Sequence, residues 1–195
     1  CSRRFIGLYV GCLFCSFGVF VPFAHLVPYA GDQGIAPGSA VLLVGAIGIG
    51  STFGRFLLGG IADRIGRRNA LLATFAGMGL AFFIWAISTS LWSLAVFALV
   101  YGTFYGGWVA LLPPFVMDNF GSRNVSSIIG VLYTSAAFGT LIGPSASGFI
   151  FDGSGSYLVA ILASAAGNVA AVVIVALTSR SDAGSYPPLP SGEKT

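Results

Sequence analysis

Charged residues are scarce in this chain. Only 8% of its 195 residues are Asp, Glu, Lys or Arg, whereas 56% are hydrophobic. A soluble domain needs far more charge to cover its surface. The composition therefore indicates an integral membrane protein. The net charge of +3 does not indicate nucleic-acid binding, because the few basic residues lie among hydrophobic segments and form no basic face.

Cysteine and histidine are also scarce. Three Cys and a single His are too few for a disulfide framework or a zinc cluster. The sequence contains no motif for a catalytic nucleophile or a phosphate loop. It also lacks paired intramembrane carboxylates, because Asp63, Asp118 and Asp152 all lie at the ends of apolar segments. We therefore expect no enzyme activity, no bound metal and no cofactor.

The sequence has instead six apolar runs of about 20 residues or more, the length that a membrane-spanning helix needs. Backbone groups cannot stay unpaired in lipid, so each run must be helical. This pattern predicts an all-α membrane protein with one six-helix bundle at 1–177 and a disordered cytoplasmic tail at 178–195. The predicted spans are 5–29, 40–62, 69–88, 91–115, 126–151 and 157–177.

Two local features qualify these spans. Pro113 and Pro114 should disrupt the fourth helix near its inner end, because proline lacks the backbone N–H. Trp85 and Trp92 flank a short turn, which is typical of an aromatic belt at the membrane surface. We therefore expect the fourth helix to end early and both indoles to lie at the interface.

Basic residues lie on one side of the predicted membrane. The turn at 63–68 contains three arginines, and such charge marks the cytoplasmic side. With this turn inside, both chain ends and the turn at 117–124 are also inside. Eight of the nine Lys and Arg residues then lie in the cytoplasm. We expect a multi-pass protein of the plasma membrane with both ends cytoplasmic.

The ninth basic residue, Arg55, lies inside the second span. It precedes Asp63 by about 12 Å along a helix axis, which places it near the middle of the hydrocarbon core. An arginine there costs about 2.5–3.5 kcal/mol on insertion scales and usually has a function. Ligand binding is therefore one interpretation. An ion pair with another helix and snorkelling toward the surface are the alternatives.

Polar and aromatic side chains on the other spans join Arg55 as candidates. Ser51 lies one turn before Arg55 and shares its face. His25 is either a neutral imidazole packed on another helix or a proton or ligand site. The aromatic stripe of the fourth span, formed by Tyr101, Tyr105 and Trp108, lies on one face, which lipid contact or packing would also explain. The candidate substrate-binding residues are Arg55, Ser51, His25, Tyr105, Trp108 and Tyr133.

The turn after the second span resembles the signature loop of the major facilitator superfamily. The matching pattern is Gly59-x-x-x-Asp63-Arg64-x-Gly66-Arg67-Arg68. Gly66 suits a turn that needs positive φ. The resemblance implies that these six residues form a gating loop, in which Asp63 pairs with Arg64 and Arg68 in a cytoplasmic clasp. The clasp would favour one of the two access states of a carrier.

Further motifs resemble the monocarboxylate transporters and the oxalate:formate antiporter within that superfamily. These motifs are Pro22-x-x-His25-Leu-Val-Pro-Tyr-Ala30, Gly54-Arg55-x-x-x-Gly59 and Leu112-Pro-Pro-x-x-x-Asp118-x-Phe-Gly121. The resemblance implies transport of small organic anions by alternating access, with proton coupling or exchange, and Arg55 binding the substrate carboxylate. It also implies two partners, the lipid bilayer and an N-terminal six-helix half.

Three features favour the C-terminal half: the absence of an initiator Met, the short polar tail, and the resemblance itself. Two departures from the family are present. Animal members have an aspartate one turn before the arginine, where this chain has Ser51. The lysine that some oxalate carriers bear on the eleventh helix has no counterpart in 126–151. A carrier of sugars or drugs, and a non-transporting receptor or scaffold, remain alternatives.

Overall fold

The computed structural model describes residues 3–121 and 125–179, and within them every regular element is an α-helix. α1 and α2 together make one membrane-length segment, so six segments are long and apolar enough to span a membrane. The prediction of an all-helical membrane protein with six spans is therefore confirmed. The predicted tail from residue 180 onward lies outside the described residues. The helices are α1 (Arg3–Val19), α2 (Val21–Asp32), α3 (Pro37–Ile65), α4 (Arg67–Ile87), α5 (Leu91–Phe120), α6 (Val125–Ser154) and α7 (Leu158–Thr178).

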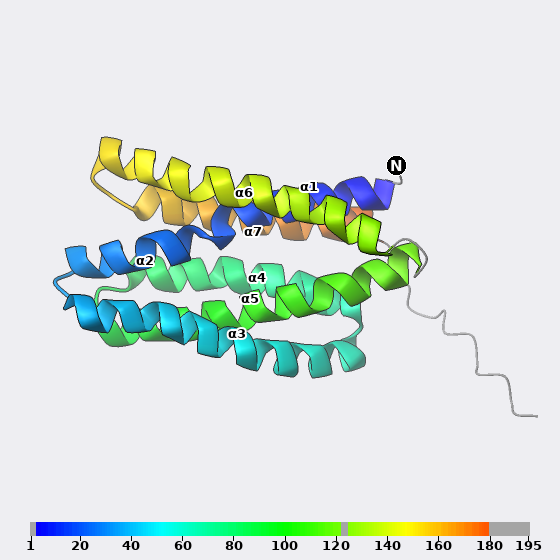
Figure 1. Cartoon of the computed structure of the whole chain (residues 1–195), viewed down its shortest axis with the longest axis horizontal. Helices are drawn as coiled ribbons and strands as arrows, with labels where there is room; N and C mark the ends of the chain where they lie inside the picture. Colours follow the sequence, from blue (N-terminus) through cyan, green and yellow to red (C-terminus); the bar gives the residue numbers. More distant parts are fainter. Residues whose placement is uncertain (1–2, 122–124, 180–195) are drawn as a thin grey trace, which may run out of the picture.

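The helices run lengthwise in two groups. In Figure 1, α1, α6 and α7 form the upper group, and α3, α4 and α5 form the lower group. α3 packs mainly on α5, and α1 packs on α6 and α7, while α4 contacts both α5 and α7 and so joins the two groups. α2 continues α1 toward α3 (Figure 1).

Four glycines with positive φ mark the two ends of the bundle. Gly66 (φ 85°) and Gly121 (φ 77°) lie at one end, and Gly34 (φ 77°) and Gly155 (φ 65°) lie at the other. A side chain would make this backbone conformation costly, so glycine is favoured there. The predicted turn at Gly66 is confirmed. We call the two ends the Gly66 end and the Gly34 end.

α3 and α5 approach each other closely through glycines. A Cβ atom added at Gly54 would overlap the carbonyl oxygen of Thr103, and one added at Gly106 would overlap the carbonyl oxygen of Ser51. Small residues of this kind let two membrane helices come into backbone contact. The contact positions the middle of α3, which carries Arg55, beside the middle of α5.

We expect Gly54→Ala to destabilise the bundle, because the added methyl group forces α3 away from α5. Overpacking of this kind costs about 1–3 kcal/mol. Gly48→Ala is the matched control, since a Cβ atom there meets nothing within 4 Å. Size-exclusion chromatography after stepwise heating in detergent should show a lower melting temperature for Gly54→Ala alone. Equal melting temperatures would contradict the packing described here.

A break at Phe20 separates α1 from α2. Pro22 has no N–H, so one helical hydrogen bond is missing at this point. The carbonyl oxygen of Val19, next to the break, accepts a hydrogen bond of 2.7 Å from the hydroxyl of Tyr101 on α5, and both groups are buried. Tyr101, a member of the aromatic stripe, therefore stabilises the broken helix.

α5 does not end early, contrary to the expectation from its prolines. It continues through Pro113 and Pro114 to Phe120. Neighbouring groups can satisfy the backbone that proline leaves unpaired in a membrane helix. The next residues are also held in place, because Phe115 and Val116 are buried in the core. Packing therefore outweighs the local preference of proline.

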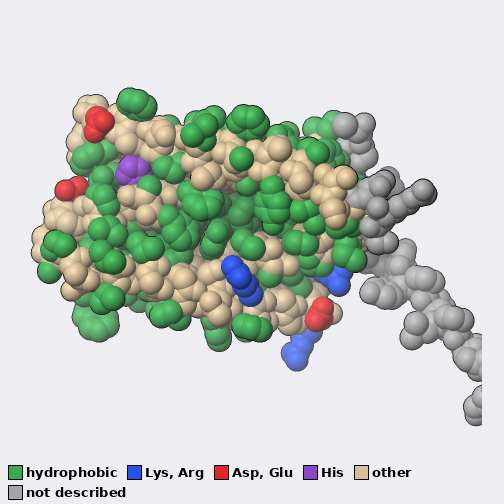
Figure 2. All heavy atoms as spheres, in the orientation of Figure 1, with side chains coloured by type: hydrophobic (Ala, Val, Ile, Leu, Met, Phe, Trp, Pro, Cys, Tyr) green, Lys and Arg blue, Asp and Glu red, His purple; other side chains and the backbone are tan. Residues whose placement is uncertain are grey.

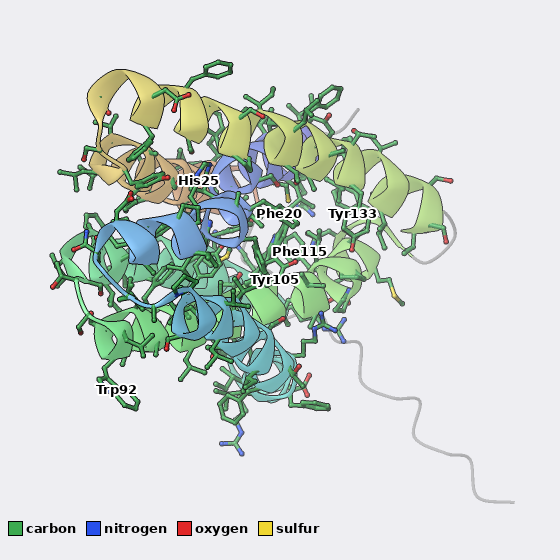
Figure 3. All side chains as sticks on the ribbon, turned by 60° about the vertical axis from the view of Figure 1, so that its left-hand side comes forward. Phe20, His25, Trp92, Tyr105, Phe115 and Tyr133 are labelled. Atoms are coloured by element: carbon green, nitrogen blue, oxygen red, sulfur yellow. The ribbon has the colours of Figure 1, made fainter. Side chains whose placement is uncertain are left out.

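Trp85 does not lie at the interface. Its side chain is 0% exposed and its ring stacks with that of Phe97 at a centroid distance of 5.0 Å. Trp92 is 81% exposed and points away from the bundle in Figure 3. The expected belt position is therefore wrong for Trp85, because its face of α4 packs against α5.

Candidate functional site

Arg55 lies in the interior of α3, about 15 Å from Ile65 along the helix axis at about 1.5 Å per residue. Its side chain is exposed, whereas Gly54 and Leu58 beside it are buried against α5. The ion pair of the described residues, Arg67 with Asp118, does not involve Arg55. Arg55 thus has no ion-pair partner within the described part of the chain, which argues against the alternative of a structural ion pair.

Two tyrosines from other helices belong to the same site. The guanidinium of Arg55 on α3 and the phenol of Tyr133 on α6 both act electrostatically on Tyr105 of α5. Tyr105 is partly buried, and Tyr133 is 45% exposed. The fold thus places the guanidinium of Arg55 and the phenol of Tyr133 within electrostatic range of Tyr105. We call these three residues the Arg55 site.

Aromatic side chains at the start of α2 flank this site. The rings of Phe20 and Phe23 lie 6.4 and 5.5 Å from that of Tyr105, both in edge-type contact. Figure 3 shows Phe20, Tyr105, Phe115 and Tyr133 in the space between α6 and the α3–α5 pair. In Figure 2, hydrophobic side chains cover much of the middle of this face. An arginine and two hydroxyls beside an apolar wall suit an anion with a small apolar part.

The sequence did not single out Phe20 or Phe23. Their contacts with Tyr105 depend on the break between α1 and α2, which turns both rings toward α5. Pro22 between them was the available signal, because proline interrupts the helical bond pattern. The interruption alone does not specify which neighbour the rings meet.

Of the other three candidates, two are buried beside the Arg55 site and one lies apart from it. Ser51 is buried, with its backbone against Gly106. Trp108 is also buried, although its ring lies 6.3 Å from that of Tyr105. His25 lies nearer the Gly34 end in Figure 3 and contacts α6. A role in substrate binding stays a prediction for all six candidates.

The predicted gating loop makes two attachments to the bundle. Nη1 of Arg67 lies 2.6 Å from the Asp118 carboxylate at the end of α5, and both side chains are substantially exposed. An exposed ion pair of this kind contributes about 0–1 kcal/mol. Arg68 donates from Nε to the Ser179 carbonyl at 3.0 Å and from Nη2 to the Ala176 carbonyl at 2.8 Å. The loop therefore joins α4 to α5 and α7.

The expected clasp of Asp63 with Arg64 and Arg68 is not present among the described residues. The guanidinium of Arg68 caps the carbonyl end of α7, where the helix dipole favours positive charge. Asp63 and Arg64 are exposed on the last turns of α3, and Gly59 has open space around it. A gating role for the loop stays a prediction.

We expect Arg68→Ala to lower the free energy of unfolding by about 1–3 kcal/mol, because it removes charge-assisted hydrogen bonds from the end of α7. Arg64→Ala is the matched control, since Arg64 is exposed and its loss should change stability by about 0.5 kcal/mol or less. Thermal unfolding in detergent, followed by circular dichroism, measures both effects. Equal losses in the two variants would contradict the capping role of Arg68.

Comparisons with known proteins agree with this architecture. Residues 6–195 match the family model described as Major Facilitator Superfamily. Monocarboxylate transporter 12 of Xenopus laevis is 33% identical over 165 residues, covering 83% of this chain and 36% of the relative. Monocarboxylate transporter 12 of Homo sapiens is 32% identical over 162 residues, covering 81% of this chain and 31% of the relative.

A second kind of relative is the Aspyridones efflux protein apdF of Emericella nidulans. It is 30% identical over 166 residues, covering 85% of this chain and 34% of the relative. The chain thus spans about a third of the length of the curated relatives that it matches.

Sequence and structure agree on one family. Six membrane-length helical segments make this a multi-pass membrane protein. The family model covers nearly all of the chain, and the relatives include monocarboxylate transporters. The chain therefore belongs to the major facilitator superfamily, a family of membrane transporters.

Proposed function

We propose that this chain is one six-helix half of a carrier for small organic anions of the monocarboxylate type. The observation that carries this proposal is Arg55, a cation in the interior of a membrane-length helix and within electrostatic range of Tyr105. A guanidinium can hold a carboxylate through two parallel hydrogen bonds. The tyrosine hydroxyls offer further donors, and the Phe20 and Phe23 rings suit the apolar part of the solute.

Transport in this proposal occurs by alternating access. In such carriers, two bundles rock about a binding site near the middle of the membrane. Arg55 is exposed in the interior of a membrane-length helix, and α6 is the least buried span. Hydrophobic side chains cover much of the face seen in Figure 2. We infer that an N-terminal six-helix half covers this face. Matching only a third of its relatives' length supports the same inference.

The Gly66 end is the cytoplasmic end in this proposal, and the membrane is the plasma membrane. Five arginines of the described residues lie at the Gly66 end, and the Gly34 end has no Lys or Arg. An excess of basic residues marks the cytoplasmic side. These five residues are Arg3, Arg4, Arg64, Arg67 and Arg68.

Efflux of larger organic solutes is a second candidate function. Two relatives, from Emericella nidulans and Paecilomyces divaricatus, are named as efflux proteins for aspyridones and agnestins. The aromatic side chains beside Tyr105 would also suit a larger apolar solute. The two functions differ in the solute that the site would bind.

Counterflow in liposomes tests the proposed function. The carrier assembled from this chain and its N-terminal half should accumulate labelled lactate or pyruvate against unlabelled monocarboxylate. Trans-stimulation by glucose alone would indicate a sugar carrier. Exchange of a large hydrophobic acid without lactate exchange would favour the efflux function. A reconstituted assembly that exchanges none of these solutes would contradict transport and favour a receptor or scaffold.

A further inference from the structure

His25 joins α2 to α6 outside the Arg55 site. Its Nε2 lies 2.9 Å from the carbonyl oxygen of Pro144. A carbonyl oxygen can only accept, so Nε2 carries a proton and donates this bond. In the neutral ring, Nδ1 is then the nitrogen without a proton. A second proton can bind at Nδ1 while the bond to Pro144 stays in place.

Both helices are weakened near this contact. α2 begins just after the break at Phe20, about one and a half turns before His25. Pro144 has no N–H, so α6 lacks one backbone hydrogen bond at this point. Gly143, the residue before Pro144, packs on the backbone of Phe17 in α1. This packing holds α6 in place on the side of the contact that faces the Gly66 end. The segments beyond the contact, toward the Gly34 end, can therefore bend more easily than the rest of the bundle.

α2 also connects this contact to the Arg55 site. Phe20 and Phe23 at its start contact Tyr105, and His25 follows within the same helix. Phe23 and His25 lie within one turn of α2, so their side chains move together. A change in the packing of Tyr105 would thus alter the geometry of the hydrogen bond from His25 to Pro144. A change in that bond would in turn alter the packing of Tyr105.

We propose that His25 is a proton-sensitive latch, which holds the Gly34 ends of α2 and α6 together more firmly when its imidazole is protonated. A protonated ring donates a charge-assisted hydrogen bond, which is about twice as strong as a neutral one. Loss of the proton weakens the bond and lets the ends of α2 and α6 separate. His25 is then a positioning residue that makes opening of the Gly34 end respond to pH. For transport, this rests on the proposed function.

A titratable side chain packs directly on His25. Tyr157, just before α7, lies against the imidazole at a centroid distance of 5.4 Å. Burial first, and then the charges of Asp32 on α2 and Asp152 on α6, raise the pKa of Tyr157. Its hydroxyl therefore stays neutral at physiological pH. α2 also contributes Tyr29, and α3 has no titratable residue between Pro37 and Gly54.

Distance measurements between spin labels test the latch. Gln33 and Gly153 are exposed at the Gly34 ends of α2 and α6, and a side chain at Gly153 meets nothing within 4 Å. Both positions are changed to Cys in the carrier assembled from this chain and its N-terminal half, with any Cys of that half removed. Cys1→Ser removes one further thiol, and Cys12 and Cys15 are buried. Distances are recorded without solute at pH 5.5 and pH 8.0, a range in which an imidazole titrates.

The parent should show a ratio of short to long distances about fivefold higher at pH 5.5 than at pH 8.0. In His25→Gln the amide can still donate to Pro144 but does not titrate, so the ratio should be the same at both pH values. His25→Ala should show mostly long distances throughout. Asp32→Asn should retain the pH response. A parent without a pH response, or a His25→Gln variant that keeps it, would overturn the proposal.

Transport provides an independent comparison. His25→Gln should transport with an unchanged KM for the anion at pH 6.5 but with a flattened pH profile between pH 5.5 and pH 8.0. A large rise in KM with an unchanged profile would instead make His25 a substrate contact and overturn the latch. The spin-label distances are measured without solute, so they test the latch even if the carrier moves a different solute.

Discussion

Arg55→Lys should weaken the binding of a monocarboxylate by roughly 10- to 100-fold while leaving membrane insertion intact. Lysine keeps the positive charge but loses the planar fork that forms two parallel hydrogen bonds with a carboxylate. Loss of one charge-assisted hydrogen bond accounts for an effect of this size. Arg55→Ala removes the charge as well and should abolish transport. The measurements are the affinity for labelled lactate and the initial rate of counterflow.

Arg3→Lys is the matched control. Arg3 is exposed in the first turn of α1, and it is not part of the Arg55 site. Its affinity and transport rate should equal those of the parent. Chromatography of each variant in detergent shows whether the protein is folded and present in equal amount. If Arg55→Lys and Arg55→Ala bind lactate like the parent, Arg55 is not the anion site.

Residues 1–195 expressed alone should transport nothing, and co-expression with the N-terminal six helices should restore uptake. Arg55 is exposed on the bundle surface at mid-membrane depth, where contact with lipid is costly by about 2.5–3.5 kcal/mol. Exposed hydrophobic side chains, such as Phe53 on α3 and Leu141 on α6, add further apolar surface to the bundle. A second bundle would cover this surface and complete the wall of the site.

Uptake of labelled lactate into liposomes measures this complementation. Co-expression of the N-terminal half with an Arg55→Ala chain is the control, and it should assemble without restoring uptake. Saturable uptake by the purified 195-residue chain alone would show instead that two copies form a complete carrier. The proposed pairing with an N-terminal half would then be wrong.

The spans were predictable because lipid imposes a simple rule on the backbone. A run of about 20 apolar residues must be helical, so length and hydropathy alone located all six segments. Gly66 was predictable for a similar reason, since few residues besides glycine adopt positive φ at a helix end. Neither inference required knowledge of which helices are neighbours.

Features that depend on neighbouring helices were not predictable in this way. The expected disruption at Pro113 and Pro114 was wrong, because the burial of Phe115 and Val116 holds α5 in a helix. Trp85 was placed at the interface, but its face of α4 is covered by α5. Periodicity cannot distinguish a face that meets protein from one that meets lipid when both are apolar.

The candidate site was likewise predictable only in the features that do not depend on neighbouring helices. Arg55 stood out because a charge inside a membrane helix is rare. Tyr105 and Tyr133 stood out as polar or aromatic side chains within apolar spans. Their common location with Arg55 depends on how α3, α5 and α6 pack. Arg68 was expected to meet Asp63, yet it caps α7, more than one hundred positions away in the chain. Contacts over such separations come from the fold and not from local spacing.

Competition between lactate and lactamide for the assembled carrier tests the central claim most directly. The two molecules have nearly the same shape, but only lactate has the negative charge that Arg55 would bind. We predict that unlabelled lactate displaces labelled lactate, that lactamide does so at least roughly 10-fold less well, and that Arg55→Ala removes the difference. Equal displacement by lactate and lactamide would contradict a carboxylate site at Arg55.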